Sequence, residues 1–126
     1  MTTLTGLSVL LLEDEYLIAL DAEQILRSLG VGNVEIVGSY ADAQERAQSA
    51  DFDVAVLDVN INGQFSFPIA DTIRARGIPF VFASGYELRA REEPGLGNAP
   101  CVTKPYTSDR LKTALMAALA GNEAKN

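Results

Sequence analysis

Short apolar runs recur along this chain and alternate with segments whose apolar residues have helical spacing. The runs are rich in Val, Ile, Leu and Phe, and they predict five strands, at residues 8–12, 34–38, 53–57, 79–83 and 100–103. Those at 8–12, 53–57 and 79–83 are almost wholly apolar, which is typical of parallel strands covered by helices on both faces. The alternation therefore predicts an α/β fold built on a parallel sheet.

The connections between the strands carry helix signals, with one exception. Apolar residues recur at helical spacing in the first connection and near the end of the chain: Ile18, Ala22, Ile25, Leu29, Leu111, Leu115 and Ala118. Residues 41–50 predict a second helix, and Pro68 suits the first turn of a third that ends near Arg76. Glycines and a proline interrupt residues 87–99, so we expect the fourth helix to be short or disordered.

Length, composition and charge exclude several classes of protein. The 126 residues, 48% of them apolar, fit one domain (1–126) with a core over about residues 7–120 and a flexible tail at 121–126. Ten basic residues against 17 acidic ones give a net charge of -7, which predicts no direct binding to nucleic acid. Cys101 is the single cysteine, and no apolar run approaches the roughly 20 residues that span a bilayer. We therefore expect a cytoplasmic protein without membrane attachment.

Polar or ionisable side chains follow four of the five expected strands: Glu13 and Asp14 after the first, Asp58 after the third, Ser84 after the fourth and Lys104 after the fifth. In open parallel sheets, ligand sites lie outside the carboxyl ends of the strands, so we expect these side chains to converge there. Glu15 is instead expected in the first turn of a helix, where the helix dipole favours an acid.

Three neighbouring carboxylates would repel one another, by about 4 kcal/mol per pair at 4 Å and an effective dielectric near 20. Lys104 offers one compensating charge, so a cation is expected as well. Oxygen ligands in a chain without histidine favour Mg²⁺ over zinc. A carboxylate beside Mg²⁺, a lysine and a hydroxyl suits phosphoryl transfer, with Asp58 on the central strand as the nucleophile.

These residues stand in motifs that resemble a known family, the receiver domains of two-component response regulators. The motifs are the acidic pair in VLLLEDE, the acceptor in VAVLDVNING, the hydroxyl in FVFASGY and the Lys-Pro of CVTKPY, in matching order and spacing. The resemblance covers essentially the whole chain. It implies a flavodoxin-like, doubly wound sheet of five strands in the order 2-1-3-4-5.

The resemblance also implies how the site works. Asp58 would accept a phosphoryl group from a sensor histidine kinase or a histidine phosphotransfer protein. Asp14, Asp58 and the main-chain carbonyl of Asn60 would bind Mg²⁺, with Glu13 acting mainly through water. Ser84 and Lys104 would each contact a phosphoryl oxygen.

Residues next to these motifs carry further expectations. The peptide bond before Pro105 is expected to be cis. The resemblance implies that Asn60 and Tyr86 would flank the path of the water that attacks the phosphoryl group. Tyr106 is expected to pack its ring on the rim of the site, with its hydroxyl in water.

The chain departs from the family at one position. Cys101 stands where the family usually has a switching aromatic residue. FVFASGY is similar instead to a receiver subgroup named for a Phe-Ala-Thr-Gly-Tyr motif, with Ser84 in place of threonine. That subgroup is associated with alphaproteobacterial signalling and with kinases of the HWE and related classes. We expect the segment 85–98 to order or repack on phosphorylation, in place of an aromatic rotation.

The resulting hypothesis is a stand-alone receiver, a monomer or weak dimer, which catalyses only its own phosphorylation and dephosphorylation. It would signal by phosphorylation-dependent binding to an unknown downstream protein or act as a phosphate sink. Two alternatives stay open: a Mg²⁺-dependent phosphatase with an aspartyl-phosphate intermediate, and a pseudo-receiver that binds partners unphosphorylated. Against the phosphatase, hydrolases of the haloacid-dehalogenase type carry their nucleophile on the first strand in an Asp-x-Asp motif.

Overall fold

The computed structural model describes residues 3–84 and 99–124, the last three of them by their backbone alone. Within these residues five parallel strands form one sheet in the order β2-β1-β3-β6-β7. Their bounds are Ser8–Leu12 (β1), Asn33–Val37 (β2), Val54–Asp58 (β3), Phe80–Ser84 (β6) and Cys101–Thr103 (β7). This is the predicted flavodoxin-like order, since the third, fourth and fifth parallel strands are β3, β6 and β7.

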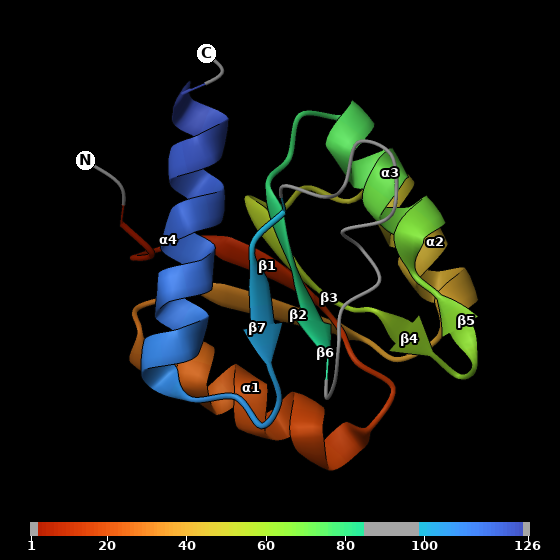
Figure 1. Ribbon diagram of the computed structural model, residues 1–126, viewed down its shortest axis with the longest axis horizontal. Coiled ribbons are helices and arrows are strands. Elements are labelled where there is room, and N and C mark those ends of the chain that lie inside the picture. Colours follow the sequence, from red (N-terminus) through yellow and green to blue (C-terminus); the bar gives the residue numbers. More distant parts are fainter. Residues whose placement is uncertain (1–2, 85–98, 125–126) are drawn as a thin grey trace.

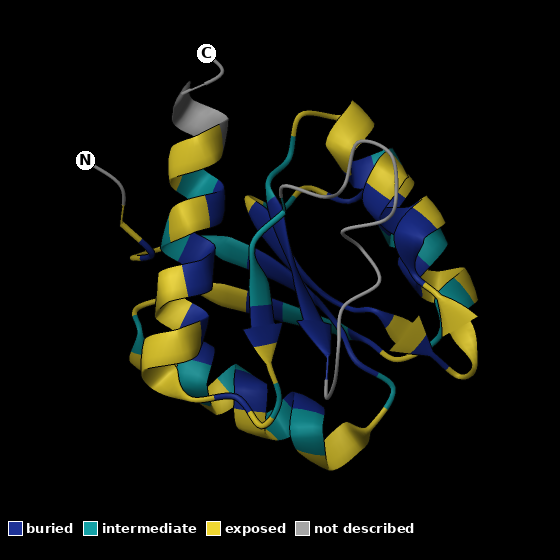
Figure 2. Cartoon of the chain, viewed as in Figure 1, coloured by how far each residue is buried: buried dark blue, intermediate teal, exposed yellow. Residues whose placement is uncertain are grey.

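Helices cover both faces of the sheet (Figure 1). Helices α1 (Tyr16–Ser28) and α4 (Ser108–Ala124) lie on one face, and α2 (Tyr40–Ser49) and α3 (Phe67–Ala75) lie on the other. Because successive strand residues point to opposite faces, Val9 and Leu11 pack under α1 and α4, whereas Leu10 and Leu12 pack under α2 and α3. Figure 2 shows the result, with buried strands and helices that are exposed only on their outer sides.

Local signals explain where the helices begin. The Ser39 hydroxyl accepts a hydrogen bond from the main-chain N–H of Asp42, at 3.1 Å, and so caps α2. The Thr107 hydroxyl caps α4 in the same way, by accepting from the N–H of Arg110 at 3.2 Å. None of the helices in the described residues is long and apolar enough to cross a membrane.

The structure shifts several of the predicted boundaries. The strands β3 and β6 begin and end one residue later than expected, so Asp58 and Ser84 are their last residues and do not follow them. Glu15 lies at the N-cap of α1, just before the first turn, and not within that turn. Helix α4 continues to Ala124, into the stretch for which we expected a tail. The fourth helix of the prediction falls in residues 85–98, outside the described residues.

A small antiparallel hairpin, which the sequence analysis missed, follows β3. It consists of β4 (Asn60–Ile61) and β5 (Gln64–Phe65). Its turn residues, Asn62 and Gly63, both have positive φ angles, of 51° and 86°. An Asn-Gly pair between short strands is a recognised signal for a two-residue hairpin turn, because both central residues need that conformation. The hairpin borders the sheet edge described below.

Two leucines of α1 differ strongly in burial, so their mutations should differ in their effect on stability. Leu26 is 0% exposed, whereas Leu17 on the same helix is 79% exposed. Leu26→Ala should reduce the free energy of unfolding by about 2–5 kcal/mol, through lost burial and an unfilled cavity. Leu17→Ala, the matched control, should change it by no more than about 0.5 kcal/mol. Urea unfolding of both variants measures the difference, and equal losses would contradict the packing of α1.

Candidate functional site

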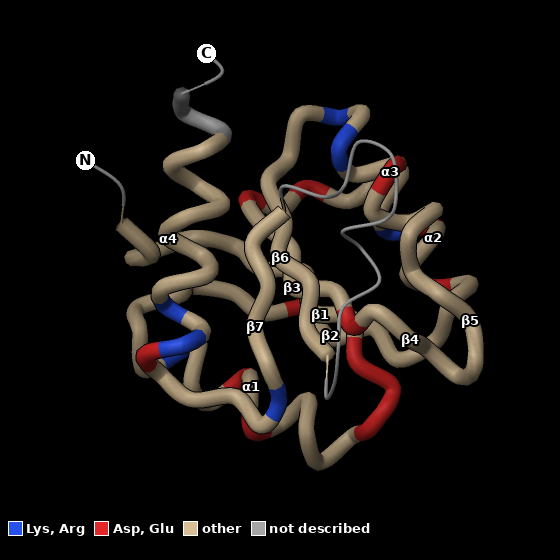
Figure 3. Tube along the Cα trace, in the orientation of Figure 1, with Lys and Arg blue, Asp and Glu red and all other residues tan. Residues whose placement is uncertain are grey.

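The sheet brings the predicted site residues to a single edge. Glu13 and Asp14 follow β1, Asp58 and Ser84 end β3 and β6, and Lys104 follows β7. Main-chain hydrogen bonds align these positions. The Glu13 N–H donates to the Val37 carbonyl at 3.1 Å, and the Lys104 N–H donates to the Ser84 carbonyl at 2.9 Å. Figure 3 shows the acidic segment between β1 and α1, and the basic position between β7 and α4, at this end of the sheet.

Lys104 joins two of the carboxylates. Its ammonium Nζ lies 2.7 Å from Oε1 of Glu13 and 2.7 Å from Oδ2 of Asp58. The three side chains are only 14%, 0% and 9% exposed, respectively. Buried charges require paired partners, and here one ammonium serves two carboxylates. The peptide bond between Lys104 and Pro105 is cis, as the resemblance implied.

A third carboxylate completes an acidic cluster. One carboxylate oxygen from each of Glu13, Asp14 and Asp58 lies within 4.8 Å of the others. Main-chain N–H groups position two of these acids: Glu15 donates to Glu13 Oε2 at 3.2 Å, and Asn62 donates to Asp14 Oδ2 at 3.0 Å. With Lys104 as its one close cation among the described residues, the cluster keeps an excess of negative charge. Its oxygens could hold a hard divalent cation.

Burial and charge shift the pKa values of two of these groups. Burial raises the pKa of Glu13, and the hydrogen bond and charge of Lys104 only partly oppose this. Burial alone would lower the pKa of Lys104, but its hydrogen bonds to Asp58 and Glu13 outweigh burial and raise it. Lys104 therefore stays protonated at neutral pH and keeps its role as the partner of both acids.

The structure shows two groups that position the acids of the site and that the sequence analysis did not identify. The hairpin places the Asn62 N–H on Asp14, and the Asn62-Gly63 pair was the signal that could have revealed it. The buried Ser66 hydroxyl donates to the main-chain carbonyl of Asp58 at 2.6 Å and so fixes the end of β3. The sequence carries no comparable signal for Ser66, since its contact with Asp58 spans the β4–β5 hairpin.

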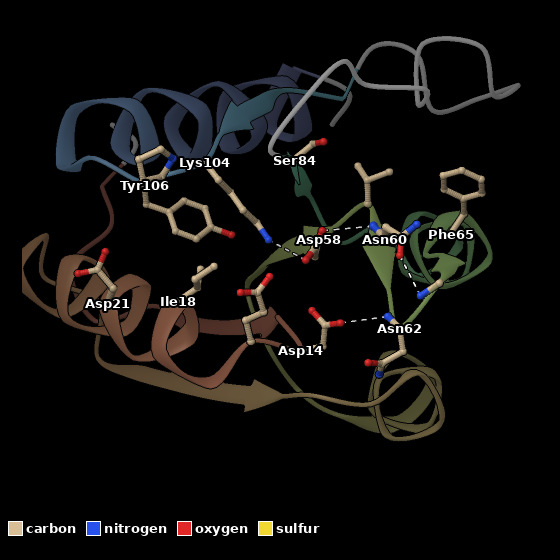
Figure 4. Close-up of a pocket in the computed structure, with 14 residues that line it drawn as sticks. Asp14, Ile18, Asp21, Asp58, Asn60, Asn62, Phe65, Ser84, Lys104 and Tyr106 are labelled. Atoms are coloured by element: carbon tan, nitrogen blue, oxygen red, sulfur yellow. Dashed lines mark hydrogen bonds and ion pairs between the residues drawn. The ribbon is translucent and has the colours of Figure 1, made fainter.

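The site opens into a pocket of about 830 Å³ (Figure 4). The pocket is lined by Asp14, Asp58, Asn60, Ser84 and Lys104. Ile18 and Asp21 of α1 also line it, together with Pro105 and Tyr106 of the connection between β7 and α4. All of the predicted site residues thus meet here except Glu13, which is buried in contact with Lys104, and Tyr86, which lies outside the described residues. The pocket is open enough to admit a phosphate-sized group beside Asp58.

Comparisons with known proteins agree on one family. Residues 9–116 match the family model of the response regulator receiver domain. A response regulator receiver protein from Sinorhizobium medicae WSM419 is 28% identical, with a TM-score of 0.81, and the match covers 95% of this chain and 99% of that one. No curated protein matches the chain.

Two solved structures of a protein called SdrG are more similar in sequence. Its BeF3-activated conformation, from Pseudomonas melonis Fr1, is 38% identical with a TM-score of 0.74, covering 94% of this chain and 99% of that one. SdrG from Sphingomonas melonis Fr1 is 38% identical with a TM-score of 0.69, covering 95% and 99%.

Because Lys104 is shared between two carboxylates, its removal should cause a loss of stability that depends on pH. Lys104→Met should cost about 3–5 kcal/mol of stability at pH 7 without metal, because it leaves the buried Glu13 carboxylate unpaired. The folded pKa of Glu13 already lies above its ordinary value of 4.5, and loss of Lys104 raises it further. A group with a raised folded pKa stabilises the fold at low pH and loses that effect as pH rises through the folded pKa. The defect relative to wild type should therefore shrink between pH 7 and pH 5.

Urea unfolding at the two pH values measures this effect. Lys112→Met, which removes an exposed lysine of α4, is the matched control and should be nearly neutral at both. A Lys104→Met defect that is independent of pH would contradict the pairing with Glu13.

Proposed function

This chain belongs to the response regulator receiver domain family, and we propose that it accepts a phosphoryl group on Asp58 from a phosphohistidine, in a reaction that requires Mg²⁺. The donor is a sensor histidine kinase or a histidine phosphotransfer protein. The observation that carries the proposal is the contact of Lys104 with Asp58 at 2.7 Å, inside an acidic cluster that opens into a pocket.

The donor set suits Mg²⁺. Three carboxylates face a single ammonium, and the part of the chain that the structure describes has no histidine or cysteine in the cluster that would favour zinc. Asp14 and Asp58 would hold the ion together with the main-chain carbonyl of Asn60, and Glu13 would act through water. When bound, Mg²⁺ supplies neutralisation of the charge on the phosphoryl oxygens.

The chain's own residues then perform the transfer by positioning. One Asp58 oxygen forms a bond to phosphorus while the bond from phosphorus to the donor's imidazole nitrogen breaks, and the electron pair leaves with the imidazole. The Asp58 carboxylate is held in place, since its Oδ1 accepts from the Asn60 N–H at 3.2 Å and its Oδ2 is paired with Lys104. Ser84 and Lys104 each contact one phosphoryl oxygen of the product.

The donor protein docks over the mouth of the pocket. Tyr16 and Leu17, at the start of α1, are 69% and 79% exposed, and they stand between the pocket-lining residues Glu15 and Ile18. Phe65 of the hairpin also lines the pocket and is 43% exposed. Large apolar side chains around a polar opening suit a protein partner.

The output is phosphorylation-dependent binding to a downstream protein, or storage of phosphate. The FVFASGY motif supports membership of the Phe-Ala-Thr-Gly-Tyr subgroup and a donor kinase of the HWE or a related class. The similar protein SdrG has a structure described as BeF3-activated, which supports the use of this phosphoryl mimic on the present chain.

The proposal predicts that a phosphoryl adduct forms at a single residue, Asp58. Incubation with acetyl phosphate and Mg²⁺ should add the mass of one phosphoryl group to the wild-type protein, as read by intact mass spectrometry. Asp58→Asn should abolish the adduct, because it removes the nucleophile. Asp71→Asn, which changes an exposed acid of α3, is the matched control and should leave the adduct intact.

The same experiment separates the alternatives. Continuous turnover of small phosphate esters would favour a phosphatase. No adduct with acetyl phosphate or with a cognate phosphohistidine donor would favour a pseudo-receiver and overturn the proposal.

Metal binding predicts a second contrast, between two acids that line the same pocket. Asp14 belongs to the acidic cluster, whereas Asp21 lies on α1 outside it. Asp14→Asn should weaken Mg²⁺ binding, measured by calorimetry, by roughly tenfold or more. Asp21→Asn should leave the affinity within about twofold, since an exposed charge outside the cluster is screened by salt. Equal effects would show non-specific attraction of the cation by the acidic surface.

A further inference from the structure

The hydroxyl of Tyr106 is buried at the site. Tyr106 is 5% exposed and lines the pocket, although the sequence placed its hydroxyl in water. Its hydroxyl oxygen is buried and has no hydrogen-bond partner among the described residues. Figure 4 shows the hydroxyl pointing from the β7–α4 connection toward the ammonium of Lys104. A buried hydroxyl without a hydrogen bond destabilises the state in which it occurs.

The surrounding charges indicate which kind of partner the hydroxyl suits. Burial, followed by the charges of Glu13 and Asp58, raises the pKa of Tyr106. The group therefore keeps its proton at any physiological pH and remains a donor. The two groups whose charges act on this hydroxyl are the carboxylates of Glu13 and Asp58, and Lys104 occupies one oxygen of each.

Phosphorylation of Asp58 would change how Lys104 is shared between the carboxylates of Glu13 and Asp58. The new phosphoryl group carries about -1.5 to -2 charges, so it attracts Lys104, whose Nζ is now shared between Glu13 and Asp58. Any movement of Nζ toward the phosphoryl oxygens weakens its contact with Glu13. Glu13 is 1% exposed, so a weaker contact with Lys104 leaves a buried carboxylate with less compensation of its charge.

We propose that Tyr106 is a positioning residue whose hydroxyl donates a hydrogen bond to the Glu13 carboxylate, directly or through one water, when Lys104 turns to the phosphoryl group. The inference rests on the proposed phosphorylation of Asp58. It assigns the unpartnered hydroxyl to the phosphorylated state, in which it compensates the buried charge of Glu13. Tyr106 thereby favours the phosphorylated form over the resting form.

The test removes the hydroxyl and keeps the ring. Tyr106→Phe should weaken binding of beryllofluoride in the presence of Mg²⁺ by roughly tenfold, the loss expected for one hydrogen bond to a charged group. The resting variant should be as stable as wild type or more so in thermal unfolding, since the hydroxyl has no hydrogen-bond partner among the residues that the structure describes. Tyr40→Phe is the matched control. Tyr40 is the first residue of α2 and packs against the hydrophobic cluster on the other face of the sheet.

A double-mutant cycle identifies the acceptor. In a Glu13→Gln background, Tyr106→Phe should change beryllofluoride affinity by no more than about twofold, because the buried charge is gone. An undiminished tenfold effect would place the acceptor elsewhere and overturn the assignment. Equal affinities of wild type and Tyr106→Phe, or a resting protein destabilised by the loss of the hydroxyl, would also overturn it.

Failure of the proposed function gives a different result. If the wild-type protein itself neither binds beryllofluoride nor forms an adduct at Asp58, the phosphorylation proposal fails and this inference fails with it. If wild type does both and Tyr106→Phe matches it, only the role of Tyr106 is refuted.

Discussion

The Lys104 ammonium contacts carboxylates that follow or end two different strands, and the whole sheet edge depends on this contact. Glu13 and Asp58 are both nearly buried, and each would be costly without a nearby positive charge. One ammonium cannot balance three carboxylates, so the edge keeps a negative excess. That excess suits a divalent cation, and the ammonium suits a phosphoryl group. The same imbalance therefore underlies both parts of the proposed chemistry.

The core holds these charges in place because the sheet is packed on both faces. Alternate residues of β1 and β3 enter two separate hydrophobic clusters, one under α1 and α4 and the other under α2 and α3. Neither strand can shift by one residue without exchanging the faces of its buried side chains. The ends of these two strands are therefore fixed as well, and with them the positions of Asp58 and of the acids that follow β1. Rigid strands thus carry the reactive groups, as precise positioning requires.

Much of this could be predicted from the sequence, for identifiable reasons. The apolar runs predicted the parallel sheet, and the acids and lysine after them identified the edge at which Glu13, Asp14, Asp58 and Lys104 meet. The hairpin was missed because its strands are two residues each, too short for a periodic pattern. The contact between Ser66 and the Asp58 carbonyl was missed because a hydroxyl in a loop carries no sign of its acceptor.

The sequence by itself determined the fold class, the edge of the sheet and the set of residues gathered there, because strand and helix periodicity and residue type are local properties. Tertiary structure decided how those residues share their charges. Only the packed sheet shows that Lys104 bridges Glu13 and Asp58, that Glu13 is buried, and that the Tyr106 hydroxyl is buried beside them without a described partner. Burial and pairing depend on segments far apart in the chain. The free-energy cost of a charge rises when water is removed from it, so this cost depends on the tertiary structure.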